Sequence, residues 1–522
     1  MNPIDFFDYR ELPLGRSDAV DWFSRHCSGL EDFLFETWKN RPQSQSGFWA
    51  ATNNSDGNSD DSDEDEIQSE TEQPYLLKKG DRFEAGRFVG TIWYEGRTIN
   101  IWPRVFQTKF ETIKNKQDST PEKQEPQVQG MRGLMTRNLL HWASRAGYFE
   151  GLNPGVADSA PASLQTFFDA YLWLFANHAR KLVATQPYWQ YQLQEEEGVV
   201  LRGRLLINPY IRDCLARGRW HRLVYEHEPF IFDNLLNQII KRACRVARAC
   251  TDADEVKELL DAIIFEMDEV EDVPRIAADC DRVHLNRMQA GYLEVLDACR
   301  MILAVAQADA SGQTGRRFCF LLPMDRLFES YLRALATESL ANTDWEMDNS
   351  QPYLIRNKDA KDAFQLKHDL FFKNKKDKCV KEQCVIADAK WKHRTRKAER
   401  NQANLGVTQG DMYQMIAYAY RRSCNNVHLL YPKMDLGTEE KTGEAKPIGT
   451  FKTWPHNEDE NSGHAITIKV WDLKIHFEEA SKTDEHGNTP EENAIKRAFQ
   501  GMLDNSQKTN TTAATETQPA TL

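Results

Sequence analysis

Six polar residues in the C-terminal half of the chain have the types and the order that suit hydrolysis of a phosphate ester. They are Glu329, Asp369, Asp388, Lys390, Gln414 and Tyr418. Two converging carboxylates form an oxygen-rich site for a hard cation such as Mg²⁺, so we expect Asp369 and Asp388 to be metal ligands. The cation would polarise a scissile phosphate and help to ionise a water, while Lys390 positions that water or stabilises the developing charge.

Two predicted strands explain why the aspartates should converge. The apolar runs around residues 364–372 and 384–391 are separated by a lysine-rich turn, which indicates an antiparallel hairpin. A hairpin can bring Asp369 and Asp388 within a few ångströms of each other. Asp388 and Lys390 are two residues apart on one strand, so they share a face.

Two predicted helices supply the other polar groups. Residues 324–335 have the periodicity of an amphipathic helix, from which Glu329 should project as a further catalytic carboxylate. A second helix starts near residue 411, and Gln414 and Tyr418 lie on one stripe of it. We expect these two side chains to contact the DNA backbone or to support the metal ligands.

Each of these features also has an ordinary structural interpretation. An Asp-x-Lys sequence is common, and an exposed Asp–Lys pair usually contributes little to stability. A glutamine and a tyrosine four residues apart usually mark a solvated helix face. The ordered combination of four elements favours a site, because the flanking apolar runs place the carboxylates at a core edge, where unpaired charges are costly.

The charge distribution agrees with a polyanionic partner despite an acidic total. The formal net charge is −13, but residues 55–73 contribute nine acidic and no basic side chains. Between residues 356 and 400 there are 15 Lys and Arg against 7 Asp and Glu. A basic stretch around the candidate site could hold DNA.

The order of the patterns predicts a multidomain α+β protein. We expect an N-terminal mixed β/α region at 1–125 with a hairpin and a disordered acidic loop at about 43–73, a mainly helical region at 126–312, an α/β core at 313–480 and a disordered tail at 481–522. No apolar run is long enough for a membrane span, and the N-terminus has no signal-peptide pattern, so we expect a cytoplasmic protein without a membrane partner.

At the six candidate residues from Glu329 to Tyr418, the chain resembles the PD-(D/E)xK nuclease superfamily, in particular its RecB-like branch. It is most similar to the McrC family, the nuclease subunits of McrBC-type modification-dependent restriction systems. The resemblance lies in Phe328-Glu329, Ile386–Lys390, Asp411–Tyr418 and Leu430–Pro432, with upstream pieces at Val89–Ile92, Ile99–Pro103, Leu201–Arg204 and Asp233–Asn237. His368 stands where the superfamily often has proline, and the acidic segment is not part of the family pattern.

The resemblance implies a restriction-endonuclease-like core and a two-component system. Such a subunit would dock on a McrB-like AAA+ GTPase hexamer, stimulate its GTP hydrolysis and cut double-stranded DNA that contains modified cytosine. Mg²⁺ would be the cofactor of this chain, and GTP would be bound by the partner subunit. The sequence contains no G-x-x-x-x-G-K-[ST] motif for binding nucleotide phosphates, which agrees with that division. Residues 1–310 would bind the ring.

Two alternatives remain open at this point. The chain could be a stand-alone RecB-like DNA repair nuclease, although its large N-terminal half has no helicase features. It could also be a non-catalytic activator of an AAA+ partner, although the Asp, Asp and Lys set is intact.

Overall fold

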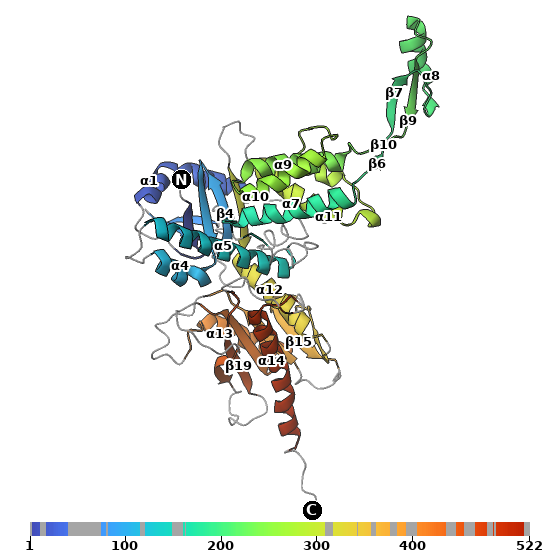
Figure 1. The fold of residues 1–522 in the computed structure, drawn as a ribbon. Coiled ribbons are helices and arrows are strands. Elements are labelled where there is room, and N and C mark those ends of the chain that lie inside the picture. Colours follow the sequence, from blue (N-terminus) through green and yellow to red (C-terminus); the bar gives the residue numbers. More distant parts are fainter. Residues whose placement is uncertain are drawn as a thin grey trace, which may run out of the picture. The chain divides into compact units, whose positions relative to one another are not determined.

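The computed structural model describes most of the chain, with gaps. The described residues are 3–10, 17–39, 75–79, 82–114, 121–148, 160–161, 163–307, 317–341, 343–356, 362–375, 384–392, 404–434, 445–453, 465–477, 484 and 487–515. The acidic loop lies outside them. Two compact units are present, one formed by Met1–Phe168 with Cys319–Leu522 and the other by Asp169–Phe318 (Figure 1). The first unit joins both ends of the chain, so the expected boundaries at 125 and 312 do not coincide with this division.

The first unit contains an N-terminal sheet of four strands in the order β1-β5-β4-β11. These strands are β1 (Ile4–Phe7), β4 (Phe88–Tyr94), β5 (Arg97–Trp102) and β11 (Phe318–Pro323). The predicted hairpin is confirmed as β4 and β5, and Glu95 and Gly96 form its turn with φ of 45° and 75°. At Gly90 a Cβ would lie 2.2 Å from the Phe320 carbonyl oxygen, so only glycine allows this close approach.

The N-terminal sheet buries apolar side chains against α1 (Ser17–Lys39) and the ribbon of β2 (Leu76–Lys79) and β3 (Arg82–Ala85). Trp22, Phe23, Leu30 and Leu34 of α1 join this core. Next in the chain come α4 (Gln107–Lys114) and α5 (Pro121–Arg145), the latter lying in the same unit.

A six-stranded C-terminal sheet has the order β12-β15-β16-β17-β19-β18. Its strands are β12 (Trp345–Met347), β15 (Leu370–Asn374), β16 (Cys384–Ala389), β17 (Asn426–Pro432), β18 (Pro447–Thr453) and β19 (Ile466–Leu473). β15 and β16 are antiparallel, which confirms the predicted hairpin, whereas β16, β17 and β19 are parallel. A separate ribbon pairs β13 (Tyr353–Arg356) with β14 (Asp362–Gln365).

Helices cover both faces of the C-terminal sheet. On one face α13 (Gln409–Arg422) buries Met415 in the same core as Phe371 of β15. On the other face lie α12 (Met324–Ser339) and α14 (Pro490–Thr515), where the ring of Phe372 contacts that of Phe499 at 6.3 Å. Because side chains alternate along a strand, successive phenylalanines of β15 serve the two layers.

The expectation of a disordered tail from residue 481 is wrong for Pro490–Thr515, which form α14. Apolar residues at helical spacing in α14 are buried, and Thr489 and Glu492 cap the helix reciprocally, with N–H···O distances of 2.8 and 3.2 Å. The buried apolar residues are Ile495, Ala498, Phe499, Met502 and Leu503. Residues 516–522 lie outside the described part.

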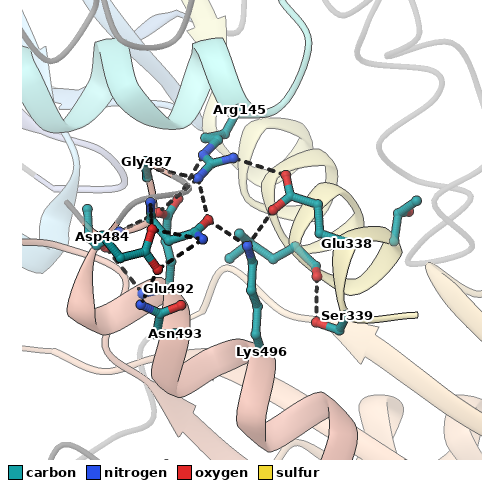
Figure 2. Close-up of polar contacts among 12 residues, drawn as sticks. Arg145, Glu338, Ser339, Asp484, Gly487, Glu492, Asn493 and Lys496 are labelled. Carbon is teal, nitrogen blue, oxygen red and sulfur yellow. Dashed lines mark hydrogen bonds and ion pairs between the residues drawn. The ribbon is translucent and has the colours of Figure 1, made fainter. Parts of the chain in front are cut away.

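Polar contacts tie α14 to α12 and α5 (Figure 2). Arg145 at the end of α5 pairs with Glu338 of α12 at 3.0 Å and with Glu492 at 3.2 Å. Lys496 of α14 also pairs with Glu338. Glu492 is fully buried and has His141 at 2.9 Å, so it is compensated by two neighbouring bases. This network holds the C-terminal helix in the first unit.

The second unit contains α9 (Leu235–Cys250), α10 (Asp254–Glu266), α11 (Tyr292–Gln307) and most of α7 (Phe167–Thr185), as the periodicity predicts. Between α7 and α9 the chain also forms the pair β6–β10 and a three-stranded sheet, β7-β9-β8. We call residues 190–231 the arm; its strands are β6 (Gln190–Tyr191), β7 (Gln194–Gly198), β8 (Arg204–Leu205), β9 (Leu223–His227) and β10 (Phe230–Ile231). Among the helices that the structure describes, none is long and apolar enough to cross a membrane.

Candidate active site

Asp388 and Lys390 lie at the C-terminal end of β16. The strand is central and strongly apolar, and Asp388 is 1% exposed. Lys390 follows the last strand residue, and its backbone N–H donates to the Leu430 carbonyl at 2.9 Å. Its Nζ lies 3.0 Å from Asp388 Oδ2. The two side chains therefore meet on one side of the strand end, as their spacing predicts.

Asp369 lies directly before β15, rather than within a strand as expected. The register pairs Leu370 with Ala387, which places Asp369 beside the end of β16. Its Oδ2 accepts the backbone N–H of Ala389 at 2.6 Å. Arg333 of α12 donates to the Asp369 carbonyl at 2.5 Å. The carboxylate is thus held against the Asp388-Ala-Lys390 segment by the Ala389 N–H, and α12 fixes the backbone of Asp369.

Gln414 and Tyr418 of α13 form a chain of hydrogen bonds that ends at Lys390. Lys390 Nζ donates to Gln414 Oε1 at 2.7 Å, and Gln414 Nε2 donates to the Tyr418 hydroxyl at 2.9 Å. The Tyr418 hydroxyl donates to the Lys367 carbonyl at 2.7 Å. Tyr418 is 3% exposed. This geometry favours the supporting role expected for the pair, because Gln414 orients the Lys390 ammonium and Tyr418 orients Gln414.

Glu329 interacts electrostatically with the two aspartates. It lies on the first half of α12, is half-buried and has Arg326 and Arg333 each at 3.6 Å. Burial raises the pKa of Glu329, and the charge of Asp388 contributes in the same direction. Glu329 therefore belongs to the electrostatic surroundings of the aspartates.

Burial dominates the electrostatics of the two aspartates. Burial raises the pKa of Asp369 well above its usual range, and the charges of Asp388 and Glu329 raise it further. The pKa of Asp388 is also raised by burial, against the effect of Lys390. Burial alone would lower the pKa of Lys390, but the charges of Asp388 and Asp369 outweigh it and raise that pKa. Lys390 is therefore a cation at neutral pH.

These donors fit a cation that needs few protein ligands. Within the described ranges, no three His, Cys, Asp or Glu side chains form a group that could hold a metal ion. Mg²⁺ commonly binds through one or two carboxylates and keeps several waters. Burial raises the pKa of both carboxylates, and the charge of Asp388 also raises that of Asp369. A divalent cation would stabilise the charged form of such groups, so Asp369 and Asp388 fit it.

Asp411 and Lys392 lie beside the site and were not among the expected site residues. Asp411 at the start of α13 has a side chain that is 1% exposed, and its Oδ1 lies 3.0 Å from Lys392 Nζ and 3.9 Å from Lys390 Nζ. Although burial opposes it, hydrogen bonds from Thr408 and Lys392 lower the pKa of Asp411. The available signal was the position of Asp411 three residues before Gln414 on one helical stripe.

Comparison with solved structures supports the fold. A chain from the assembly described as "tetradecameric assembly of Thermococcus gammatolerans McrB AAA+ hexamers with bound McrC" has a TM-score of 0.62 at 15% identity, covering 96% of this chain and 100% of its own length. A chain of the cryo-EM structure of the Thermococcus gammatolerans McrBC complex has a TM-score of 0.42 at 17% identity, with coverage of 65% and 89%. The first match agrees with a mixed α+β architecture. No curated protein matches the chain.

Comparison with family models identifies the family of the chain, which the structural likeness alone does not. The family model described as McrBC 5-methylcytosine restriction system component matches residues 83–432. This range includes the β4–β5 hairpin, the whole second unit, and all six candidate residues from Glu329 to Tyr418. It covers more than half of the chain. The chain therefore belongs to the McrBC 5-methylcytosine restriction system component family.

Proposed function

We propose that this chain is the Mg²⁺-dependent endonuclease subunit of a GTP-dependent restriction complex that cleaves DNA containing modified cytosine. The observation that carries the proposal is the convergence of Asp388, Lys390 and Gln414, linked by distances of 3.0 and 2.7 Å, with Asp369 held against the same strand end. Membership of a restriction-system family supplies the biological context. We assign this arrangement to a PD-(D/E)xK site.

The residues divide the chemistry between them. Asp369 and Asp388 would hold Mg²⁺, which supplies Lewis-acid activation of the scissile phosphate and of a water. Lys390 remains protonated, so it contributes positive charge toward the phosphate and orients the attacking water; it does not remove a proton. Gln414 fixes the ammonium, and Tyr418 fixes Gln414. Glu329 of α12 adds negative charge near the aspartates.

The partner of the proposed complex is a McrB-like AAA+ GTPase hexamer, which would bind the GTP. The assembly to which the chain is structurally similar is described as McrB AAA+ hexamers with bound McrC. We assign docking to the second unit, because exposed large apolar side chains gather on its arm. They include Tyr191, Leu193, Val199, Val200, Ile207, Trp220 and Phe230. A cluster of solvent-exposed apolar side chains of this size is typical of an interaction surface.

A reconstitution tests the proposal and separates it from two alternatives. The chain is combined with its AAA+ GTPase, and cleavage of methylated and unmethylated DNA is measured with and without GTP and Mg²⁺. We expect cleavage of methylated DNA only when partner, GTP and Mg²⁺ are all present. Cleavage without the partner would indicate a stand-alone repair nuclease. Stimulated GTP hydrolysis without any cleavage would indicate a non-catalytic activator.

A further inference from the structure

A buried carboxylate of the N-terminal sheet is bonded to the residue that follows Lys390. Asp8 lies at the end of β1 and is 0% exposed. It accepts the Trp391 indole N–H at 2.5 Å, the Arg104 backbone N–H at 2.5 Å and Arg104 Nε–H at 3.1 Å. The Arg104 guanidinium also donates to the Trp391 carbonyl at 3.4 Å. Asp8 and Arg104 thus hold both the side chain and the backbone of Trp391.

Trp391 is placed to transmit this restraint to the candidate site. It is 5% exposed, and its ring lies 5.3 Å from that of Phe328, the neighbour of Glu329 on α12. β16 ends at Ala389; the Lys390 backbone N–H still donates to the Leu430 carbonyl, and the next residue in the chain is the anchored Trp391. The anchoring of Trp391 therefore helps to determine where the Lys390 ammonium can reach.

A second connection joins the N-terminal sheet to α12. The edge strand β11 continues directly into this helix, whose first residue Met324 donates its backbone N–H to the Arg87 carbonyl at 2.9 Å. The side chain of Arg87 also pairs with Asp325 at 3.5 Å. Both elements that flank the candidate site, the end of β16 and the start of α12, are consequently attached to one sheet.

We propose that the N-terminal sheet positions the active site, with Asp8 and Arg104 as positioning residues that act on Lys390 through Trp391. This inference rests on the proposed function. It assigns to the N-terminal sheet a role in catalysis in addition to any role in docking. Small displacements of a positioned group reduce rates strongly, on the order of 100-fold for about 1 Å. Loosening Trp391 should therefore lower kcat while DNA binding is retained.

Trp391→Phe tests the positioning role, because it keeps a ring against Phe328 and removes the indole N–H. The matched control is Trp471→Phe. Trp471 is 6% exposed and lies on β19 of the C-terminal sheet, which also contains β16. Its indole donates to His428 Nδ1 at 2.9 Å. Both variants lose one buried indole hydrogen bond, but only Trp391 adjoins the site. In the assembled complex with Mg²⁺ and GTP, we expect Trp391→Phe to lower kcat roughly tenfold with KM for DNA within about twofold.

The control variant should cleave within about twofold of the wild-type kcat. Arg104→Lys retains the charge but loses the planar guanidinium, so it should also lower kcat, as Trp391→Phe does. Equal kcat values for the two tryptophan variants would overturn the positioning role, as would a loss confined to KM. If the wild-type complex shows no cleavage, or if Asp388→Asn cleaves as well as wild type, the proposed function fails, and this inference with it.

Discussion

Lys390 has well-defined contacts among the candidate residues. It contacts Asp388 and Gln414 directly, and the surrounding carboxylates keep it charged. The sequence predicted Lys390 and Asp388 because a two-residue spacing on a strand fixes a shared face. It could not predict that Asp8, 382 positions before Lys390 in the sequence, lies close by, since such proximity depends on the tertiary fold.

Replacing Lys390 should separate charge from shape. We expect Lys390→Ala to reduce single-turnover cleavage about 100-fold or more, because a preorganised charge at the phosphate is lost. Lys390→Arg should recover only part of the rate, since a planar fork replaces a compact ammonium. Lys392→Ala is the control: that side chain is 45% exposed and pairs with Asp411, so its loss should cost much less. Full activity of the arginine variant would show that any positive charge suffices.

His428 should make stability depend on pH. Burial and the charge of Lys469 lower its pKa from 6.5 to about 3, and the neutral ring accepts the Trp471 indole N–H. Because the unfolded chain binds the proton more tightly, this stabilisation is complete above pH 6.5 and is lost as pH falls toward 3. Each pKa unit corresponds to about 1.4 kcal/mol, so the loss by pH 5 approaches about 2 kcal/mol.

The measurement is the free energy of unfolding by denaturant between pH 7 and pH 5. His428→Asn offers an acceptor that does not titrate, so its stability should vary less over this range than that of the wild type. An identical pH dependence in both proteins would contradict a buried neutral histidine.

At the scale of elements, the sequence predicted those with a strong local pattern. The β4–β5 hairpin follows from its Glu95-Gly96 turn, and α12 from its apolar stripe. Helix α14 was missed because its polar C-terminal half dominated the composition, although Ile495, Phe499 and Met502 have helical spacing. What fixes α14 is the buried network at its first turn, which involves residues about 350 positions away.

Glu492 should be the central residue of that network. It contacts His141 at 2.9 Å, Arg145 at 3.2 Å and the Tyr331 hydroxyl at 3.2 Å. We expect Glu492→Ala to lower the free energy of unfolding by about 3–5 kcal/mol, because it leaves buried partners uncompensated. The adjacent Glu491 pairs only loosely with Lys474, at 3.8 Å, so Glu491→Ala should cost less than about 1 kcal/mol. Chemical denaturation measures both, and equal losses would contradict the network's role.

At the scale of the whole molecule, the chain divides differently from the expected linear series of domains. The strand β11 and helix α12 return the chain to the N-terminal sheet, so the first unit contains residues from both ends. Periodicity detects helices and strands along the sequence but not the pairing of β4 with β11, more than 220 residues apart. The second unit is an insertion between these strands, so we expect variants in it to alter docking without altering cleavage.

Trp220 on the arm should matter for the partner and not for folding. It is 70% exposed, whereas Phe265 on α10 of the same unit is 83% exposed and lies outside the arm. We expect Trp220→Ser to weaken stimulation of the partner's GTPase at least several-fold, since exposed tryptophans are frequent anchors of interfaces. Phe265→Ser should leave stimulation unchanged. GTP hydrolysis is measured against the concentration of the chain, and equal behaviour of the two variants would refute docking through the arm.

Cleavage of methylated DNA by the Asp388→Asn complex tests the central claim most directly. This nearly isosteric change removes one proposed metal ligand, and Glu346→Gln removes an exposed carboxylate from β12 of the same sheet as a control. With the AAA+ partner, GTP and Mg²⁺, we predict no cleavage by Asp388→Asn, normal cleavage by Glu346→Gln, and undiminished GTPase stimulation by both. Cleavage by Asp388→Asn at the wild-type rate would contradict the assignment of the active site.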